Sequence, residues 1–393
     1  MSHVARESER GVVSSPLDGL LVLDLSRAVA GPHAGMMLGD LGARVIKIES
    51  PGGDDARQWG PPFVGGESTY FLSVNRNKES VIVDLKTEVG RTTLDALVER
   101  ADVLIENFST GTMERLGFSE DRLRALNPRL VVLSVTGFGH DGPEANRPGY
   151  DQIAQGEAGL MSVTGSGPTD PQRVGVPISD VLAGLYGAFG IMAALYDRER
   201  TGVGTTVRTS LLAATVGAHV YQGTAQTVAN HTGRARGNHH PSLAPYGLFR
   251  TSDGIVQIAV GNDRHWKALL STLDLNDDDR FTTNSDRVNN HGALVEFLEA
   301  ALTHSESNTV LTQLELAGVP AGRIRTMDEV YAWDQTRSQG LVVTVEHAAL
   351  GPIEIPGPAL RFFDETGEFT PTRHLAPPTL GQHTASVLRW LES

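Results

Sequence analysis

Apolar runs of strand length, separated by segments of helical character, fill the first part of the chain and limit its fold more than any other feature. The runs occupy residues 19–26, 43–50, 80–86, 102–108 and 130–138. They are rich in Val, Ile and Leu over nearly their whole length, which is typical of strands that are buried on both faces. The alternation of such strands with helices predicts an α/β fold in which a parallel sheet is covered on both sides.

The pattern changes in the second half of the chain, which indicates a second domain. Residues 224–238 are polar, contain glycine and show no period, as linkers do. Residues 245–261 then predict a β-hairpin with its turn at 252–254, and helical segments follow it. The proline- and glycine-rich C-terminal part is expected to return to the first domain. We predict a large domain of residues 1–222, completed by 343–393, and a smaller α+β domain with its linkers over residues 223–342.

Charge and composition exclude several classes of function. The chain has 393 residues, a formal net charge of −14 and no cysteine. The negative charge disfavours nucleic acids and anionic membranes as partners, and the lack of cysteine excludes disulfides, thiolate metal sites and a cysteine nucleophile. The longest apolar stretch, 181–196, is shorter than the roughly 20 residues of a membrane span, so we expect a buried core helix. The N-terminal residues contain no apolar signal core, and we expect a cytoplasmic protein without a membrane partner.

The first strand–helix–strand segment invites comparison with dinucleotide-binding folds. Glu49 ends the second strand, where such folds place an acid for a ribose hydroxyl. The glycine turn, however, reads G-P-H-A-G at residues 31–35 and lacks the G-x-G-x-x-G pattern, and Pro32 removes a backbone donor. We therefore expect no nicotinamide cofactor. No metal-binding motif is recognisable in the sequence either, and we expect no metal.

One carboxylate, Asp180, lies at the start of the most hydrophobic helical stretch, residues 174–195. As an N-cap it would accept backbone N–H bonds, and the helix dipole would lower its pKa. An ionised carboxylate in an apolar setting is also a candidate nucleophile toward a carbonyl carbon. These two interpretations are compatible, and the residue pattern alone leaves both open.

Other candidate binding residues lie near the expected ends of strands, where open α/β sheets bind their ligands. Asn107 and Phe108 offer an amide group and an aromatic face, and Lys86 and Arg115 offer positive charge for phosphates. Tyr150 and Asp151 follow at the junction of a loop with a helix. Taken singly, each of these residues is better explained by an ordinary role at the surface, in the core or as a helix cap.

Taken together, a series of segments in a fixed order carries a resemblance to a known family. The segments read PLDGLLVLDLSRAVAGP, LGARVIKIESPGGDDAR, NRNKESVIVDLK, ADVLIENFSTGTMERLG, TGFGHDGPEANRPGYDQIAQ, VGVPISDVLAGLYGAFGIMAAL, RGNHHPSLAPYGLF and PPTLGQHT. In this order the chain, from about residue 16 to residue 391, resembles the class III coenzyme A transferases, which include formyl-CoA and carnitine-type CoA transferases. The resemblance implies a Rossmann-like large domain, a smaller domain and an interlocked homodimer.

The resemblance also implies roles for individual residues. The family's nucleophilic aspartate matches Asp180, and its active-site tyrosine and the neighbouring acid match Tyr150 and Asp151. The implied coenzyme contacts are Val29, Ala30, Val83, Lys86, Asn107, Phe108 and Arg115. A glycine-rich loop that covers the site in formyl-CoA transferase falls near Gly237, Asn238 and His239. That loop is not a glycine run in this chain, so a narrow specificity for formate or oxalate is not implied.

The implied reaction moves coenzyme A from an acyl-CoA to a small carboxylic acid, through an anhydride and a thioester on the aspartate. Dicarboxylates such as succinate are the expected acids, and coenzyme A enters as part of the acyl-CoA substrate. Two alternatives stay open at this point. An α-methylacyl-CoA racemase would need a histidine base where this chain has Tyr150, unless His140 replaces it. A protein that binds acyl-CoA without catalysis is the other alternative.

Overall fold

The computed structural model describes residues 15–365 and 367–393, which form two compact units. The first unit comprises the described residues up to Leu160, together with Val174–Asn230 and Asp334–Ser393. The second comprises Met161–Arg173 and His231–Trp333. The domains expected from the sequence differ from these units at residues 161–173, which group with the second unit, and at 223–230 and 334–342, which group with the first.

A six-stranded sheet organises the first unit, and its strand order is β5-β2-β1-β6-β7-β8. Every neighbouring pair is parallel. The strands are β1 (Leu21–Asp24), β2 (Arg44–Glu49), β5 (Lys78–Ile82), β6 (Val103–Glu106), β7 (Val131–Thr136) and β8 (Thr206–Ser210). The predicted α/β class and parallel sheet are confirmed. The chain adds strands outward from β1 in one direction and from β6 in the other, so the strand order reverses between these two strands while all strands stay parallel.

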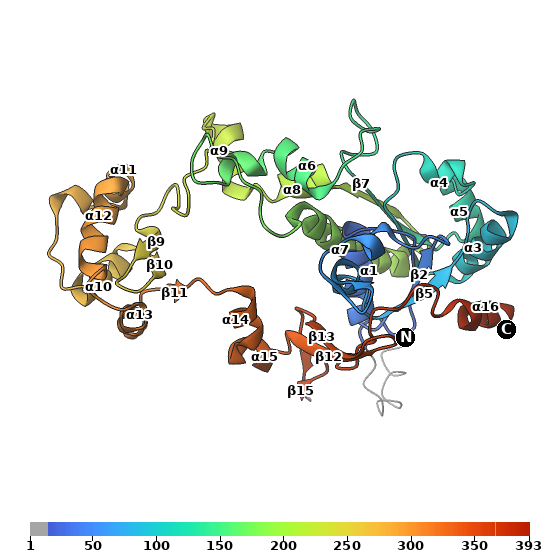
Figure 1. Ribbon diagram of the computed structural model, residues 1–393. Coiled ribbons are helices and arrows are strands. Elements are labelled where there is room, and N and C mark those ends of the chain that lie inside the picture. Colours follow the sequence, from blue (N-terminus) through green and yellow to red (C-terminus); the bar gives the residue numbers. More distant parts are fainter. Residues whose placement is uncertain (1–14, 366) are drawn as a thin grey trace. The chain divides into compact units, whose positions relative to one another are not determined.

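Helices cover both faces of this sheet (Figure 1). One face packs against α1 (Ala30–Asp40), α7 (Ile178–Thr201) and α8 (Leu211–Gly217). The other packs against α3 (Glu88–Arg100), α4 (Thr112–Arg115), α5 (Glu120–Leu126) and α16 (Thr384–Glu392). Successive strand residues point to opposite faces, so Val22 belongs to the first core and Leu23 to the second. Because both faces are buried, the strands are apolar throughout.

The apolar helix α7 differs from the expectation that it is buried as a whole. Its small residues, including Ala183, Gly184 and Gly187, are buried against α1 and the sheet. Its opposite side is exposed and apolar, with side chains at Leu185, Tyr186, Phe189, Met192 and Tyr196 that are 37–75% accessible. Among the described residues, α7 is also the one helix whose length and composition would suffice to cross a membrane, a property that core helices share.

The C-terminal segment crosses the first unit and pairs with it. Arg57 donates to the carbonyl oxygen of Pro378, and the backbone N–H of His383 donates to Ser80. Val387 of α16 is fully buried in the second of the two cores. The remaining elements of this unit are β3 (Phe63–Val64), β4 (Glu67–Ser68), α2 (Thr69–Ser73), α6 (Asp151–Glu157), α9 (Val220–Ala229), α15 (Asp334–Ser338), β12 (Val342–His347), β13 (Gly351–Pro356), β14 (Phe363–Asp364) and β15 (Gly367–Glu368).

The second unit contains a three-stranded antiparallel sheet in the order β11-β10-β9. Its strands are β9 (Tyr246–Arg250), β10 (Ile255–Ala259) and β11 (Ala321–Arg323), and its helices are α10 (Asp263–Thr272), α11 (Asn284–Asn289), α12 (His291–Leu302), α13 (Ser307–Leu316) and α14 (Met327–Ala332). The predicted hairpin is confirmed, because β9 and β10 pair and the N–H of Thr251 donates to Gly254 across the turn. Phe249, Trp266 and Leu298 lie in its separate core.

Candidate active site

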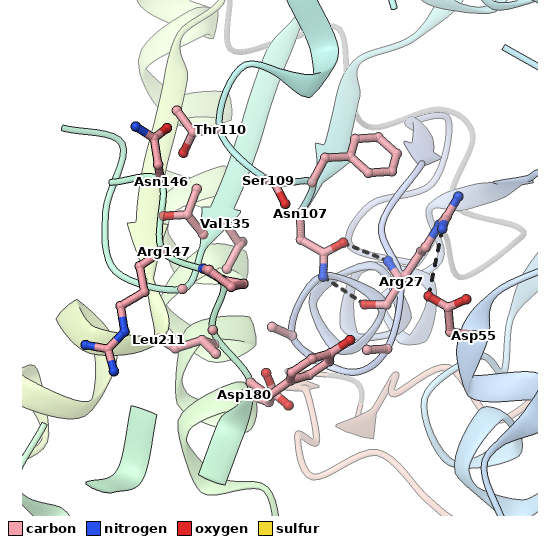
Figure 2. Close-up of a pocket in the computed structure, with 18 of the residues that line it drawn as sticks. Arg27, Asp55, Asn107, Ser109, Thr110, Val135, Asn146, Arg147, Asp180 and Leu211 are labelled. Carbon is pink, nitrogen blue, oxygen red and sulfur yellow. Dashed lines mark hydrogen bonds and ion pairs between the residues drawn. The ribbon is translucent and has the colours of Figure 1, made fainter. Parts of the chain in front are cut away.

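A cavity of about 270 Å³ opens at the carboxyl ends of β1 and β6, where the strand order reverses. In open α/β sheets this crevice is the usual place for a ligand, because loops from neighbouring strands diverge there. All of its lining residues belong to the first unit (Figure 2). They include Arg27, Ala28 and Ala30 after β1, Asn107, Phe108, Ser109 and Thr110 after β6, Thr136 and Gly137 at the end of β7, and Asp55, Trp59, Arg147, Tyr150 and Asp180 from other segments.

Asp180 lines the cavity from the first turn of α7, and Asp151 holds this turn by accepting its backbone N–H groups. One carboxylate oxygen of Asp151 accepts the backbone N–H of Ser179 at 2.8 Å and that of Asp180 at 3.4 Å. The other accepts the side-chain amide of Gln155 at 2.7 Å. Asp151 is therefore the group that satisfies the start of this helix, and the side chain of Asp180 stays available to the cavity.

The predicted capping role of Asp180 is wrong, and so is the predicted lowering of its pKa. Helix α7 begins at Ile178, and neither Asp180 nor the N-cap residue Pro177 makes a side-chain capping bond. Burial and, second, the negative charge of Asp151 raise the pKa of Asp180 from 3.8 to about 7. The helix dipole acts in the opposite direction but is weaker than these two effects. Near neutral pH the carboxyl group is consequently present in both its acid and its ionised form.

Tyr150 and Asp180 both line the cavity, whereas Asp151 does not. The Tyr150 side chain is 66% exposed, and its ring lies edge-on to that of Trp59, with ring centroids 6.4 Å apart. Trp59 in turn contacts Tyr70 at 5.1 Å between centroids. Tyr150 and Trp59 thus form an aromatic wall of the cavity that is open to solvent at Tyr150.

Asn107 joins the loop after β6 to the turn after β1. Its side-chain oxygen accepts the backbone N–H of Arg27 at 2.8 Å, and its side-chain nitrogen donates to the carbonyl oxygen of the same residue at 2.8 Å (Figure 2). Phe108 follows, and its N–H donates to the buried carboxyl of Glu106 at 2.9 Å. The guanidinium group of Arg27 lies over the Phe108 ring, 5.7 Å from its centroid. The two loops therefore hold each other in place at the mouth of the cavity.

The sequence analysis missed the two arginines of the cavity. Arg27 is held at 3.8 Å from Asp55, and Arg147 pairs with Glu144 at 3.6 Å and with Glu157. The signal for Arg27 was its place directly after a predicted strand, in the stretch DLSRAVAGP. Arg147 carried a weaker signal, three residues before Tyr150 in a loop without periodicity.

Of the residues expected at the coenzyme, Ala30, Asn107 and Phe108 line this cavity, and four others do not. Val29 lines a second, largely apolar cavity of about 540 Å³ next to α1. Val83 is 5% exposed and packs in the core beside α3 and α4. Lys86 and Arg115 are exposed near the carboxyl ends of β5 and β6, and Arg115 donates to the hydroxyl of Thr112 at 2.6 Å.

The expected covering loop belongs to the second unit. Gly237 adopts a φ of +65° and donates its N–H to Gly165 at 2.9 Å. Asn238 forms a bridge with Arg236, and the ring of His239 lies 4.1 Å from that of His291. The loop is thus fixed within its own unit by backbone pairing and ring contacts.

His140, the alternative base of a racemase, lies in a different cavity. It lines a space of about 180 Å³ on the far side of Phe108 and Thr136, and its Nε2 is 2.7 Å from the hydroxyl of Ser134. That hydroxyl also bonds to Glu106. No histidine is among the described residues that line the cavity of Asp180, so the geometry gives Asp180 no histidine partner there.

Comparison with known proteins identifies the family of the chain. Residues 17–384 match the family described as CoA-transferase family III. The human succinyl-CoA:glutarate CoA-transferase is 39% identical over 95% of this chain and 85% of its own length, and the acetyl-CoA:oxalate CoA-transferase of Acetobacter aceti is 39% identical over 95% of each chain.

A solved structure extends the comparison to the fold. The crystal structure of a CAIB/BAIF family protein from Brucella suis superposes with a TM-score of 0.85 and 39% identity, covering 96% of this chain and all of that one. The resemblance inferred from the ordered sequence segments is confirmed. The chain belongs to CoA-transferase family III and is a CoA-transferase.

Proposed function

We propose that the chain transfers coenzyme A from an acyl-CoA to a small carboxylic acid, with Asp180 as the nucleophile. The observation that carries this proposal is the position of Asp180 in the lining of the cavity where the strand order reverses. Asp55 is the other carboxylate that lines the cavity, but its side chain is 64% exposed and lies beside Arg27. Burial and the negative charge of Asp151, rather than a cation, shift the pKa of Asp180, so within the described part of the chain no ion pair competes with its attack on a carbonyl carbon.

The transfer requires four substitutions at carbonyl carbon. A carboxylate oxygen of Asp180 attacks the thioester carbonyl, the C–S bond breaks, and a mixed anhydride and the CoA thiolate form. The thiolate then attacks the aspartyl carbonyl, releases the donor acid as its carboxylate and leaves an aspartyl-CoA thioester. The acceptor carboxylate attacks this thioester, the C–S bond breaks, and a second anhydride and the CoA thiolate form. The thiolate finally attacks the acceptor carbonyl of this anhydride. Acyl-CoA leaves and the carboxylate of Asp180 is restored, so no group is consumed.

Small dicarboxylates are the proposed acids. The named relatives from human and Acetobacter aceti act on glutarate and oxalate, respectively. The cavity of this chain carries two arginines, Arg27 and Arg147, which suit a second carboxylate because a guanidinium group can donate two parallel hydrogen bonds to it.

For the coenzyme we propose the loops after β1, β5 and β6. Ala30, Asn107 and Phe108 border the cavity, and the exposed cations Lys86 and Arg115 lie at the same edge of the sheet, where phosphate groups would find positive charge. Val29 and Val83 are buried and would support these loops rather than touch the ligand through their side chains.

We also propose that the enzyme acts as a homodimer, interlocked as the sequence resemblance implies. The exposed residues Leu185, Phe189, Met192 and Tyr196 recur along one side of α7 at helical spacing and leave an apolar stripe open to solvent. Stripes of this kind are rare on monomers and mark protein interfaces.

The test of the reaction uses the full chain with succinyl-CoA and a panel of acids that contains glutarate, oxalate and acetate. New thioesters are detected by mass spectrometry. We expect glutaryl-CoA or oxalyl-CoA to form with the wild type and with Asp95→Ala, a matched change at a half-buried aspartate that pairs with Arg122 away from the cavity. Asp180→Ala should bind coenzyme A but form no product. Transfer by Asp180→Ala at the wild-type rate would exclude the proposed nucleophile.

A further inference from the structure

The turn that follows β1 borders the cavity and has an uncommon backbone. Ala28 adopts a φ of +63°, in the left-handed region that costs a residue with a Cβ atom about 1–2 kcal/mol. Gly31 packs so closely against the turn that a Cβ at this position would lie 2.3 Å from the Cβ of Ser26. Since this backbone is unfavourable by itself, other groups must hold it.

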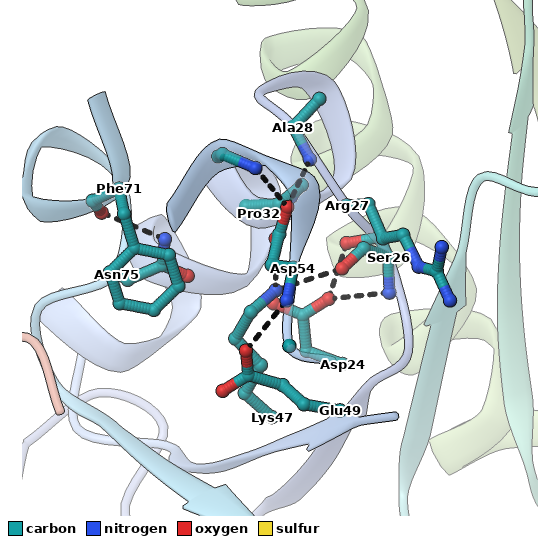
Figure 3. Close-up of polar contacts among 12 residues, drawn as sticks. Asp24, Ser26, Arg27, Ala28, Pro32, Lys47, Glu49, Asp54, Phe71 and Asn75 are labelled. Atoms are coloured by element: carbon teal, nitrogen blue, oxygen red, sulfur yellow. Dashed lines mark hydrogen bonds and ion pairs between the residues drawn. The ribbon is translucent and has the colours of Figure 1, made fainter. Parts of the chain in front are cut away.

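A buried ion pair beneath the turn supplies these contacts (Figure 3). One carboxylate oxygen of Asp54 accepts the N–H of Ala28 at 3.1 Å and that of Ala56 at 2.9 Å. The other lies 2.8 Å from the ammonium group of Lys47, which also donates to the carbonyl oxygen of Ser26 at 2.8 Å. The pair thus contacts the turn at two of its residues.

A second buried pair continues the network along the same turn. Lys78 contacts Asp24 at 2.8 Å and donates to the carbonyl oxygen of Pro32 at 2.7 Å. Asp24 in turn accepts the N–H of Ser26 at 3.0 Å. Burial by itself would raise the pKa of Asp24, but Lys78 and Lys47 lower it below its usual value, so Asp24 is ionised.

Stability alone is a poor explanation for this network. The side chains of Lys47 and Asp54 are 0% and 1% exposed, and removing two charges from water costs about as much as their attraction returns. Neither side chain lines the cavity, whereas Arg27, Ala28 and Ala30 of the turn do. The contacts of the pair reach Ser26 and Ala28, in a segment whose backbone is strained at Ala28.

We propose that Asp54 and Lys47 are positioning residues, which hold the turn Ser26–Ala30 in the geometry that binds coenzyme A without touching the ligand. The proposal rests on the proposed function, because the turn is assigned to the coenzyme there. Asn107 clamps the same turn at Arg27 from the other side. With its backbone fixed at Ser26, Arg27 and Ala28, the turn presents one arrangement to the ligand before binding, which lowers the entropy lost on association.

The decisive variant is Asp54→Asn. Its side-chain NH₂ group must face either the ammonium group of Lys47 or the two backbone N–H groups, so one donor meets another in both orientations. The turn then loses its support at Ala28. A glycine adopts positive φ without help, so Ala28→Gly in the Asp54→Asn background should restore the turn. The matched control is Asp95→Asn, which breaks a partly exposed ion pair with Arg122 outside the cavity.

Three measurements on the full chain separate the outcomes: the dissociation constant of coenzyme A by calorimetry, kcat and KM for succinyl-CoA, and hydrogen exchange of the peptide that contains residues 26–33. For Asp54→Asn we expect coenzyme A to bind about tenfold more weakly, an increase in KM larger than the change in kcat, and faster exchange in this peptide. The double variant should recover most of the affinity, although its melting temperature stays low. Asp95→Asn should match the wild type.

Loss of stability without loss of affinity, or a double variant no better than Asp54→Asn, would overturn the positioning role. Faster exchange at unchanged affinity would overturn it as well and would leave the proposed function intact. A wild type that does not bind coenzyme A would instead contradict the proposed function, and the positioning role with it. Should Asp54→Asn not fold, Asp54→Glu keeps the charge, displaces the carboxylate by one methylene group and is judged by the same measurements.

Discussion

Asp151 accepts the backbone N–H of Asp180, and the two carboxyl groups therefore lie together at the start of α7. Burial and this neighbouring charge raise the pKa of Asp180 to about 7. A nucleophile held in this way is partly protonated at neutral pH, and its attack on a thioester requires the ionised form. The burial that raises the pKa of Asp180 therefore also limits the rate of the reaction at low pH.

The pH dependence of the transfer follows from this relationship. We expect kcat/KM to rise with pH through an apparent pKa of about 7 and to level off above it, because only ionised Asp180 reacts. Asp151→Asn removes the like charge, so the midpoint should move to lower pH. The measurement is a pH–rate profile of both proteins with succinyl-CoA. A midpoint that does not move would show that Asp151 does not influence the ionisation of Asp180.

The covalent intermediate gives a second prediction. Borohydride added during turnover should reduce an aspartyl-CoA thioester and convert Asp180 to the corresponding alcohol, which peptide mass mapping detects. Hydroxylamine should trap the same position as a hydroxamate. Asp180→Asn serves as the control and should remain unlabelled. A label on Asp55, which also lines the cavity, would contradict the assignment of Asp180 as the nucleophile.

Stability should depend on pH through the same carboxyl group. The pKa of Asp180 is raised from 3.8 to about 7 on folding, so the folded chain holds the proton more tightly than the unfolded chain. Its contribution to stability is complete below about pH 4 and is lost as the pH rises through 7. Asp180→Asn, which stays neutral, should therefore melt a few degrees higher than the wild type at pH 8, and the difference should vanish near pH 4. Thermal melts at several pH values provide the comparison, and a constant difference would contradict the assignment.

The contact between α1 and α7 depends on Gly184. A Cβ at this position would lie 2.8 Å from the carbonyl oxygen of Ala30 and 2.8 Å from Nδ1 of His33. Gly184→Ala should separate the two helices and lower the free energy of unfolding by about 2 kcal/mol. Gly292→Ala in α12, where a Cβ would meet open space, is the matched control and should be as stable as the wild type or slightly more stable, because alanine favours a helix more than glycine does. Denaturant unfolding distinguishes the two, and equal stability of the variants would contradict close packing at Gly184.

The exposed side of α7 predicts the assembly state. Phe189 is 75% exposed, and Phe189→Glu should weaken the proposed dimer because it places a charge in the apolar stripe. Val89→Glu, at a 78% exposed position on α3, is the control for a charge on another helix. Sedimentation velocity should show a dimer for the wild type and the control, with monomer or unfolded chain for Phe189→Glu. A monomeric wild type would contradict the proposal.

The sequence by itself determined the parallel sheet, the hairpin of the second unit and the family. Apolar runs such as 19–26 and 130–138 contain the observed strands because burial on both faces requires apolar side chains at every position. Asp180 was recognised because a lone charge in an apolar helix is conspicuous in any sequence, and the order of the motifs needed no coordinates.

Only the tertiary structure decided what surrounds Asp180. A residue near a helix start can have a lowered or a raised pKa, and the sign depends on burial and on Asp151, which is 29 residues away in the sequence. The place of Arg27 beside the cavity, and the support of its turn by Asp54 and Asn107, likewise depend on which strands are neighbours. Periodicity reports which face of an element is apolar, whereas contacts between distant segments fix ionisation and backbone strain.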